Sequence, residues 1–154
     1  MDVLTYRPGE VVITVCGYVV EGWTSVALAR NSPVFKQYRG IRGKNSRVKI
    51  KDSSFTLRLT MTQTTVTNDV FSSLLQLDER TGTARLEVVV KDTAGTSLLS
   101  SSTAYFEGYP ETTYSASQTE RVWTLLCDTA DDYVVGGNAH QGIDFSDILS
   151  RLSI

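Results

Sequence analysis

The side chains that could perform acid–base or metal chemistry are few, and their spacing does not favour it. The single histidine, His140, lies in a glycine-rich segment over residues 136–142, where a solvent-facing loop position is expected. A metal site needs several Cys, His or carboxylate ligands at short spacings, and the sequence has no such Cys/His cluster. Asp131 and Asp132 are adjacent, so we expect them to diverge on a strand or to lie in a turn rather than to act as a catalytic pair.

The motifs for nucleophilic and phosphate chemistry are also incomplete. None of the serines lies in a Gly-x-Ser-x-Gly turn, which exposes the nucleophile in many hydrolases. The run Gly136-Gly137-Asn138 lacks the Lys-Ser or Lys-Thr pair that completes a phosphate-binding loop. We therefore expect no catalytic, cofactor-binding or metal-binding residues, no cofactor, and a protein that is not an enzyme.

The charges are separated along the sequence, although the formal net charge is only −2. Residues 22–51 contain eight basic side chains and no acid, whereas residues 120–151 hold six acids against two arginines. Two solvated faces would explain this pattern, and so would a basic surface on one copy that meets an acidic surface on the next. A nucleic-acid groove is a third interpretation, weakened by the small number of interleaved aromatics. The basic residues are Arg30, Lys36, Arg39, Arg42, Lys44, Arg47, Lys49 and Lys51.

A length of 154 residues is enough for one hydrophobic core, so we expect a single domain over residues 1–154. No apolar run approaches the roughly 20 residues of a membrane span, and the N-terminus lacks the pattern of a secretory signal. The chain is therefore expected to fold where it is made. In a reducing compartment, Cys16 and Cys127 are expected to be core thiols rather than a disulfide.

Residues 55–65 alternate between apolar and polar side chains, which predicts a long strand with one buried face. Phe55, Leu57, Leu59 and Met61 form the apolar face. The other face carries threonine hydroxyls and one cation, a surface better suited to a smooth hydrated wall than to a ligand pocket. This polar face consists of Thr56, Arg58, Thr60, Thr62 and Thr64.

Most of the remaining chain is also typical of strands. Alternating or β-branched segments cover residues 11–17, 23–30, 47–51, 84–91, 97–106 and 121–127. The first two are expected to form a hairpin through Glu21-Gly22, and turns are expected at residues 52–54 and 92–95. Seven or eight strands are enough for two packed antiparallel sheets or a small barrel.

One helix is expected over residues 67–81. Thr67, Asn68 and Asp69 provide capping groups, and Arg80 with Gly82 marks the end. A second short amphipathic segment, helix or strand, is expected at the C-terminus. Its apolar residues are Phe145, Ile148, Leu149 and Leu152.

Residues 31–46 are expected to form a long extended loop, because Pro33, Gly40 and Gly43 break any periodicity. The loop also contains Phe35, Tyr38 and Ile41, which gain nothing from solvent exposure. Two interpretations remain open: the loop packs back onto its own domain, or it reaches a neighbouring subunit.

Several short motifs follow one another in a particular order. They are Ile13-x-Val15-x-Gly17, Gly22-Trp23, the basic segment, Gln63-Thr64-Thr65, Asn68-Asp69-Val70, Leu74-Leu75, Asp78, Asp92-x-x-Gly95, Ala104, Pro110, Arg121-x-Trp123 and Gly136-Gly137-Asn138. In this succession the chain resembles the tail tube (inner tube) proteins of contractile-tailed bacteriophages, over nearly its whole length. No single motif among them is diagnostic.

The resemblance implies a mainly β fold: two packed antiparallel sheets as a sandwich or small barrel, one flanking helix, and a β-lined ring on oligomerisation. Rings, expected to be hexameric, would stack head to tail into a hollow tube that delivers DNA to the host. Residues 55–65 would form a wall strand, with the apolar face in the core and the polar face of Thr56, Arg58, Thr60, Thr62 and Thr64 toward the lumen. The 31–46 arm would pack onto the adjacent ring. The arm residues are Phe35, Lys36, Tyr38, Arg39, Ile41, Arg42 and Lys44, and the acidic partner surface is Asp128, Asp131, Asp132, Asp144 and Asp147.

The implied partners are further copies of the chain, the tail sheath protein, a tape-measure protein, and the baseplate and tail-terminator proteins. Genomic DNA would pass without sequence-specific binding, and the protein would be a virion tail component assembled in the host cytoplasm. The alternatives are the tube protein of a contractile injection or secretion machine, an adhesive β-sandwich of a virion, and an oligosaccharide- or nucleic-acid-binding module.

Overall fold

The computed structural model of the chain describes residues 3–83 and 85–137. These residues form antiparallel strands, one α-helix and a short 3₁₀ turn, which confirms the expected mainly β fold with two antiparallel sheets and one helix. The elements are η1 (Pro8–Glu10), β1 (Val11–Val15), β2 (Tyr18–Val19), β3 (Trp23–Arg30), β4 (Phe35–Arg39), β5 (Asn45–Lys49), β6 (Phe55–Thr62), α1 (Thr67–Thr81), β7 (Leu86–Asp92), β8 (Leu98–Phe106), β9 (Glu120–Cys127) and β10 (Asp132–Val134).

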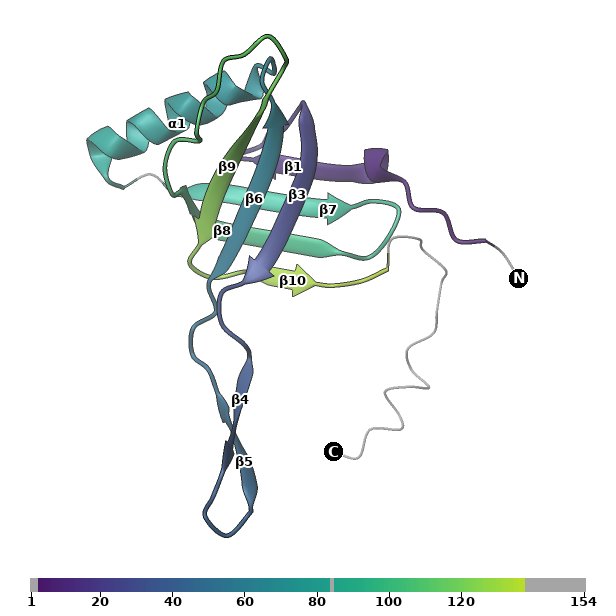
Figure 1. Cartoon of the computed structure of the whole chain (residues 1–154), viewed down its shortest axis with the longest axis vertical. Coiled ribbons are helices and arrows are strands. Elements are labelled where there is room, and N and C mark those ends of the chain that lie inside the picture. Colours follow the sequence, from purple (N-terminus) through teal and green to yellow (C-terminus); the bar gives the residue numbers. More distant parts are fainter. Residues whose placement is uncertain (1–2, 84, 138–154) are drawn as a thin grey trace.

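The larger sheet folds over to form both layers of the body. Its described strands follow the order β2-β1-β7-β8-β9-β6-β3, and β10 pairs with β8. In Figure 1, β3, β6 and β9 run across the direction of β7, β8 and β10. The layers meet where β8 and β9 pair over a short register, from Ala104↔Cys127 to Phe106↔Leu125. The smaller sheet is the separate β4–β5 hairpin.

The core lies between the two layers, and β6 supplies its centre. Phe55, Leu57, Leu59 and Met61 are all buried, which confirms the predicted alternation. The strand ends at Thr62, earlier than the predicted residue 65, because the chain then turns directly into α1.

Helix α1 covers one end of the layered body (Figure 1). The Phe71 ring lies 5.0 Å from the Phe106 ring and 5.5 Å from the Trp123 ring, in tilted and edge-on arrangements that favour aromatic packing. The helix spans the predicted residues and ends at Thr81, and the C-cap residue Gly82 adopts the left-handed φ of +66° common at helix C-termini.

The predicted capping of α1 is wrong, because its N-cap residue is Val66, with no side-chain cap. The polar residues that follow are used for tertiary contacts instead. The Thr67 hydroxyl donates to the Glu21 carbonyl at 2.9 Å. Asn68 donates its amide to the Thr62 and Gln63 carbonyls at 3.0 and 3.2 Å, and its Oδ1 accepts the Trp123 indole N–H at 3.0 Å. Asn68 thus joins β6, α1 and β9.

The predicted hairpin between residues 11–17 and 23–30 is also wrong. Strand β1 instead turns at Cys16 and Gly17, with φ of +52° and +81°, into the two-residue strand β2. Two successive positive φ values are typical of a tight two-residue hairpin turn. Strand β3 pairs with β6 in the other layer. The same turn exposes Cys16, so only Cys127 is a core thiol; both are free, as predicted.

Both predicted aspartate turns are present. The Asp52 carboxylate accepts the Ser54 N–H, and the Asp92 carboxylate accepts the Ala94 N–H, each at 3.1 Å. Among the described residues, no helix has the length and apolarity needed to cross a bilayer. The predicted C-terminal amphipathic segment lies outside the described residues, as does His140.

Candidate functional site

The outward side of β3, β6 and β9 forms a broad surface of small and hydroxyl-bearing side chains, here called the outer face. Cross-strand pairing places Thr60 between Ser25 and Val122, and Arg58 between Ala27 and Thr124. The members of the outer face are Ser25, Ala27, Ala29, Thr56, Arg58, Thr60, Thr62, Glu120, Val122, Thr124 and Leu126. Four of the five residues predicted for a wall surface therefore lie together on one face.

Thr64 is the exception. It lies beyond the end of β6, and its hydroxyl accepts a hydrogen bond from the Gln118 side chain at 3.1 Å. It belongs to the turn into α1 rather than to the outer face.

The outer face carries little charge. Arg58 is exposed, and its two cross-strand neighbours, Ala27 and Thr124, are uncharged. Glu120 lies opposite Thr62 at the end of the face. The face is therefore close to neutral, with separated charges rather than a cluster that could hold a specific ion.

Strand β3 forms an edge of the large sheet in the described part of the chain, since it pairs with β6 on one side only. Eight residues of backbone are thus presented beside the outer face. An open edge of this length can accept a strand from another chain, which would extend the outer face across a subunit boundary.

The 31–46 segment is a β-hairpin rather than an extended loop. Strands β4 and β5 pair in register from Phe35↔Lys49 to Arg39↔Asn45, and the hairpin projects away from both layers (Figure 1). Every residue of both strands is exposed, so the first interpretation, packing back onto its own domain, is wrong. Local pairing explains the extension: the Gly40–Gly43 turn closes with the Gly43 N–H donating to the Gly40 carbonyl at 2.9 Å.

The exposed hairpin combines apolar and cationic side chains. The Arg47 guanidinium lies 4.2 Å from the centre of the Phe35 ring, and the Lys36 ammonium lies 5.5 Å from that of Tyr38. Ile41, at the tip, is fully exposed. These features are typical of an interaction surface, because such side chains gain from burial only when a partner covers them.

A polar cluster fixes the root of the hairpin. Arg30 donates to the Ser32 carbonyl at 2.9 Å and to the Asp52 carbonyl at 2.8 Å. The Asp52 carboxylate in turn accepts the hydroxyls of Ser54 and Ser32 at 2.7 and 2.8 Å. These bonds join the two chain segments that lead into and out of the hairpin.

Acid is expected to loosen this root. Hydrogen bonds from Ser54 and Ser32, aided by Arg30, lower the pKa of Asp52 from its usual 3.8. A carboxylate with a lowered pKa stabilises the fold above its unfolded-state pKa, and the stabilisation is lost as the pH falls through the lower, folded-state pKa. The Ser54 amide resonance in a ¹⁵N-correlated NMR titration should therefore shift with a midpoint below 3.8. A midpoint at or above 3.8 would contradict the root geometry, and Asp52→Asn should remove the transition.

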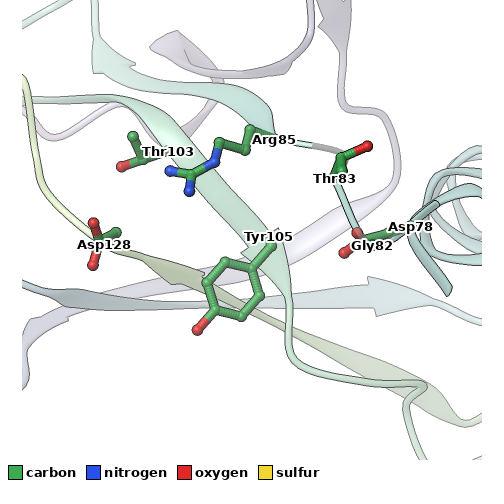
Figure 2. A pocket seen from close by; sticks show the side chains of 7 residues that line it. All are labelled: Asp78, Gly82, Thr83, Arg85, Thr103, Tyr105 and Asp128. Atoms are coloured by element: carbon green, nitrogen blue, oxygen red, sulfur yellow. The ribbon is translucent and has the colours of Figure 1, made fainter.

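The predicted acidic surface is only partly described. Asp128, Asp131 and Asp132 are exposed at the bend between β9 and β10, whereas Asp144 and Asp147 lie outside the described residues. Asp128 lines a pocket of about 350 Å³ with Asp78, Arg85 and Tyr105. Figure 2 shows the Arg85 guanidinium directed to the side of the pocket where Thr103 and Asp128 lie. Asp128 thus shares its surroundings with a cation of its own chain.

The described residues contain no group of three His, Cys, Asp or Glu side chains that could hold a metal ion.

One notable acid was missed as a site residue. Asp92 is 5% exposed, and its Oδ2 has no hydrogen-bond partner in the described part of the chain. The sequence did indicate that Asp92 would be buried, because it continues the alternating inward positions of Leu86, Val88 and Val90 in β7.

The fold is similar to that of chains from known contractile machines. No family model matches the chain. A chain of the anti-feeding prophage tube-terminating cap superimposes with a TM-score of 0.57 at 11% identity, covering 87% of this chain and 95% of that chain. The sheath–tube complex of an extracellular contractile injection system contains a chain that superimposes with a TM-score of 0.57 at 13% identity. The match covers 84% of this chain and 93% of that chain. The chain therefore has a tail tube-like fold, in agreement with the resemblance found in the sequence.

A sequence relative gives a more particular likeness. The chain is 26% identical over 161 aligned residues to the structural protein ORF10 of Pseudomonas phage KPP10, covering 97% of this chain and 92% of the relative. Among solved structures, a chain of the sheath/tube terminator of the same injection system also superimposes, with a TM-score of 0.52 at 15% identity. The match covers 82% of this chain and 94% of that chain.

Proposed function

We propose that the protein is a structural subunit of a phage tail tube, and that its copies join side by side into rings. The observation that carries this proposal is the outer face of β3, β6 and β9, which is broad, nearly neutral and bounded by the open β3 edge. Pairing of β3 with a neighbouring copy would continue the face around a closed ring, and closure removes the aggregation hazard of a free edge. A hexameric ring follows from the tail tube resemblance.

The outer face would line the lumen of the ring. Each phosphate held by Lys or Arg strengthens DNA binding and makes it depend on salt. Threonine and serine hydroxyls hydrate the surface, and alanine is uncharged, so these side chains do not attract the phosphates electrostatically. Arg58 is the one cation on the face, and six symmetry-related copies would be separated around the bore. Genomic DNA would therefore pass without sequence-specific binding.

The hairpin would connect one ring to the next. Every residue of its two strands is exposed, and its cations would meet acidic side chains of the adjacent ring. The first candidates for this acidic partner are Asp128, Asp131 and Asp132, with Asp144 and Asp147 as further candidates from the sequence.

The remaining partners follow from this role. A sheath would surround the tube, a tape-measure protein would occupy the bore, and baseplate and terminator proteins would bound its two ends. The protein would be assembled in the host cytoplasm and would act in the virion tail as a passive conduit, without catalysis.

A second candidate function is a tube terminator. It is favoured by the similarity to the tube-terminating cap and to the sheath/tube terminator. A terminator would form a single ring at one end of a tube, whereas a tube subunit stacks repeatedly. The tube protein of a contractile injection system is an alternative within the first proposal, since such a tube would need the same rings and stacking.

Negative-stain electron microscopy of the concentrated protein, with mass photometry of the same sample, tests these proposals. The tube proposal predicts hollow tubes of uniform diameter, alone or after addition of baseplate components. Isolated rings that never stack would favour the terminator. A monomer that neither self-associates nor responds to baseplate components would contradict both and favour a binding module.

A further inference from the structure

A second pocket opens between the two layers of the body, and Asp92 is part of its lining. It has a volume of about 300 Å³ and is lined by Val26 and Leu28 of β3 on one side and Val90 of β7 on the other. Tyr133 and Val135, at and just after β10, form part of its lining. Most of the wall is therefore apolar, as in sites that receive an apolar group.

One charged side chain lines this apolar pocket. Asp92 is 95% buried, since only 5% of its surface is exposed. Its Oδ1 accepts the Ala94 N–H at 3.1 Å, whereas Oδ2 is buried without a partner in the described part of the chain. A buried carboxylate oxygen without a donor is costly, so the pocket favours an occupant that brings a hydrogen-bond donor, best a cation, on an apolar group.

The hairpin tip of the same chain has this combination. Ile41 is fully exposed at the centre of the Gly40–Gly43 turn, and Arg39, Arg42 and Lys44 surround it in sequence. The tip cannot reach the pocket of its own chain as folded, because the hairpin projects away from the layers (Figure 1). The occupant that the charges and apolar surfaces fit is thus the hairpin tip of a second copy.

We propose that the Ile41 tip of one copy inserts into the pocket between β3 and β7 of another copy, where Arg42 or Arg39 pairs with Asp92. This inference rests on the proposed head-to-tail stacking and changes its electrostatic partner. The buried Asp92 replaces the exposed acids of the β9–β10 bend as the principal acceptor, since a desolvated pair discriminates between partners more strongly than an exposed one.

Cross-linking of full-length chains tests the pocket directly. All variants carry Cys16→Ser; Cys127 stays, because burial raises the pKa of its thiol and keeps it unreactive. One chain carries Asn45→Cys beside the tip, which leaves Ile41 and all hairpin cations in place. The second carries Val135→Cys at the pocket or, as the matched control, Tyr105→Cys at the pocket that contains Asp128. The two chains are mixed and treated with a short bis-maleimide.

We expect a cross-linked heterodimer with Val135→Cys and none with Tyr105→Cys. Asp92→Asn should reduce the initial yield about tenfold or more, as loss of one partner of a buried interfacial ion pair does. Ile41→Ser provides a second test that leaves the fold intact, since the Ile41 side chain is fully exposed; it should reduce the yield in the same way.

Three results would overturn the pocket inference: cross-linking through Tyr105→Cys instead, cross-linking through neither position, or a Val135→Cys product unaffected by Asp92→Asn. Micrographs of the same samples separate this inference from the proposed function. Tubes without the Val135→Cys product would leave the conduit standing and reject the pocket. The Asp92-dependent product without rings or tubes would support the pocket and reject the conduit.

Discussion

Reversing Arg39 and Arg42 to Glu is expected to impair tube formation strongly while leaving the subunit folded. Both side chains are exposed on a hairpin that stands away from the body, so their reversal removes no contact of the core. Placing acids against the acidic side chains that the hairpin meets in the next ring would replace attraction by repulsion. Like charges juxtaposed across an interface cost several kcal/mol, and about 1.4 kcal/mol corresponds to a tenfold change in affinity.

The measurement is the protein concentration above which tubes appear in electron micrographs, together with the far-UV circular dichroism of each variant. The critical concentration should rise by more than about tenfold. The matched control changes Arg39 and Arg42 to Lys, which keeps the charge and should retain assembly. Normal tubes from the folded Glu variant would disprove electrostatic stacking, although apolar contacts of Phe35 and Tyr38 could still hold the rings together.

Replacing Asn68 by Ala is expected to produce the largest loss of stability of any single polar substitution in the described chain. The side chain makes three hydrogen bonds, to the Thr62 and Gln63 carbonyls and to the Trp123 indole. The Trp123 side chain is 2% exposed, so water cannot replace the lost acceptor. Each buried polar group left unpaired costs about 1–3 kcal/mol, and we expect a total loss of about 3 kcal/mol or more.

Urea denaturation followed by tryptophan fluorescence measures this loss, because Trp123 reports on the core at the point of substitution. Asp69→Ala is the control at the neighbouring helical position, where the side chain is exposed. It should lose about 0.3–1 kcal/mol from the weaker interaction with the helix N-terminus. A free-energy change below about 1 kcal/mol for Asn68→Ala would show that the three bonds do not act as the junction described above.

The faces of individual elements followed directly from local sequence. Alternation over residues 55–61 identified the buried and exposed sides of β6, and Arg80 with Gly82 identified the end of α1. The same alternation was sufficient to place Thr56, Arg58, Thr60 and Thr62 on one surface. Period and side-chain type are properties of a single segment, so they can be recognised without knowing what the segment packs against.

The hairpin shows that local sequence patterns do not predict which residues will pair. Gly40 and Gly43 were treated as breaks in a loop, but they form the turn that pairs β4 with β5. Likewise, Thr67 and Asn68 have the composition of a cap and instead bond to other elements. The residue types were identified correctly, and their partners were not, because turn and cap side chains satisfy whichever backbone groups lie nearest in the folded chain.

The sequence alone thus determined a mainly β chain, its helix, the polar wall of β6 and the separation of basic from acidic segments. Only the tertiary structure decided which strands are neighbours, that β3 joins β6 rather than β1, and that the hairpin leaves the body. It also decided that Asp92 is enclosed between the layers beside apolar residues of β3 and β7. These outcomes depend on contacts between residues far apart in the chain, and the free energy of burying one face against another is not encoded in the period of either segment.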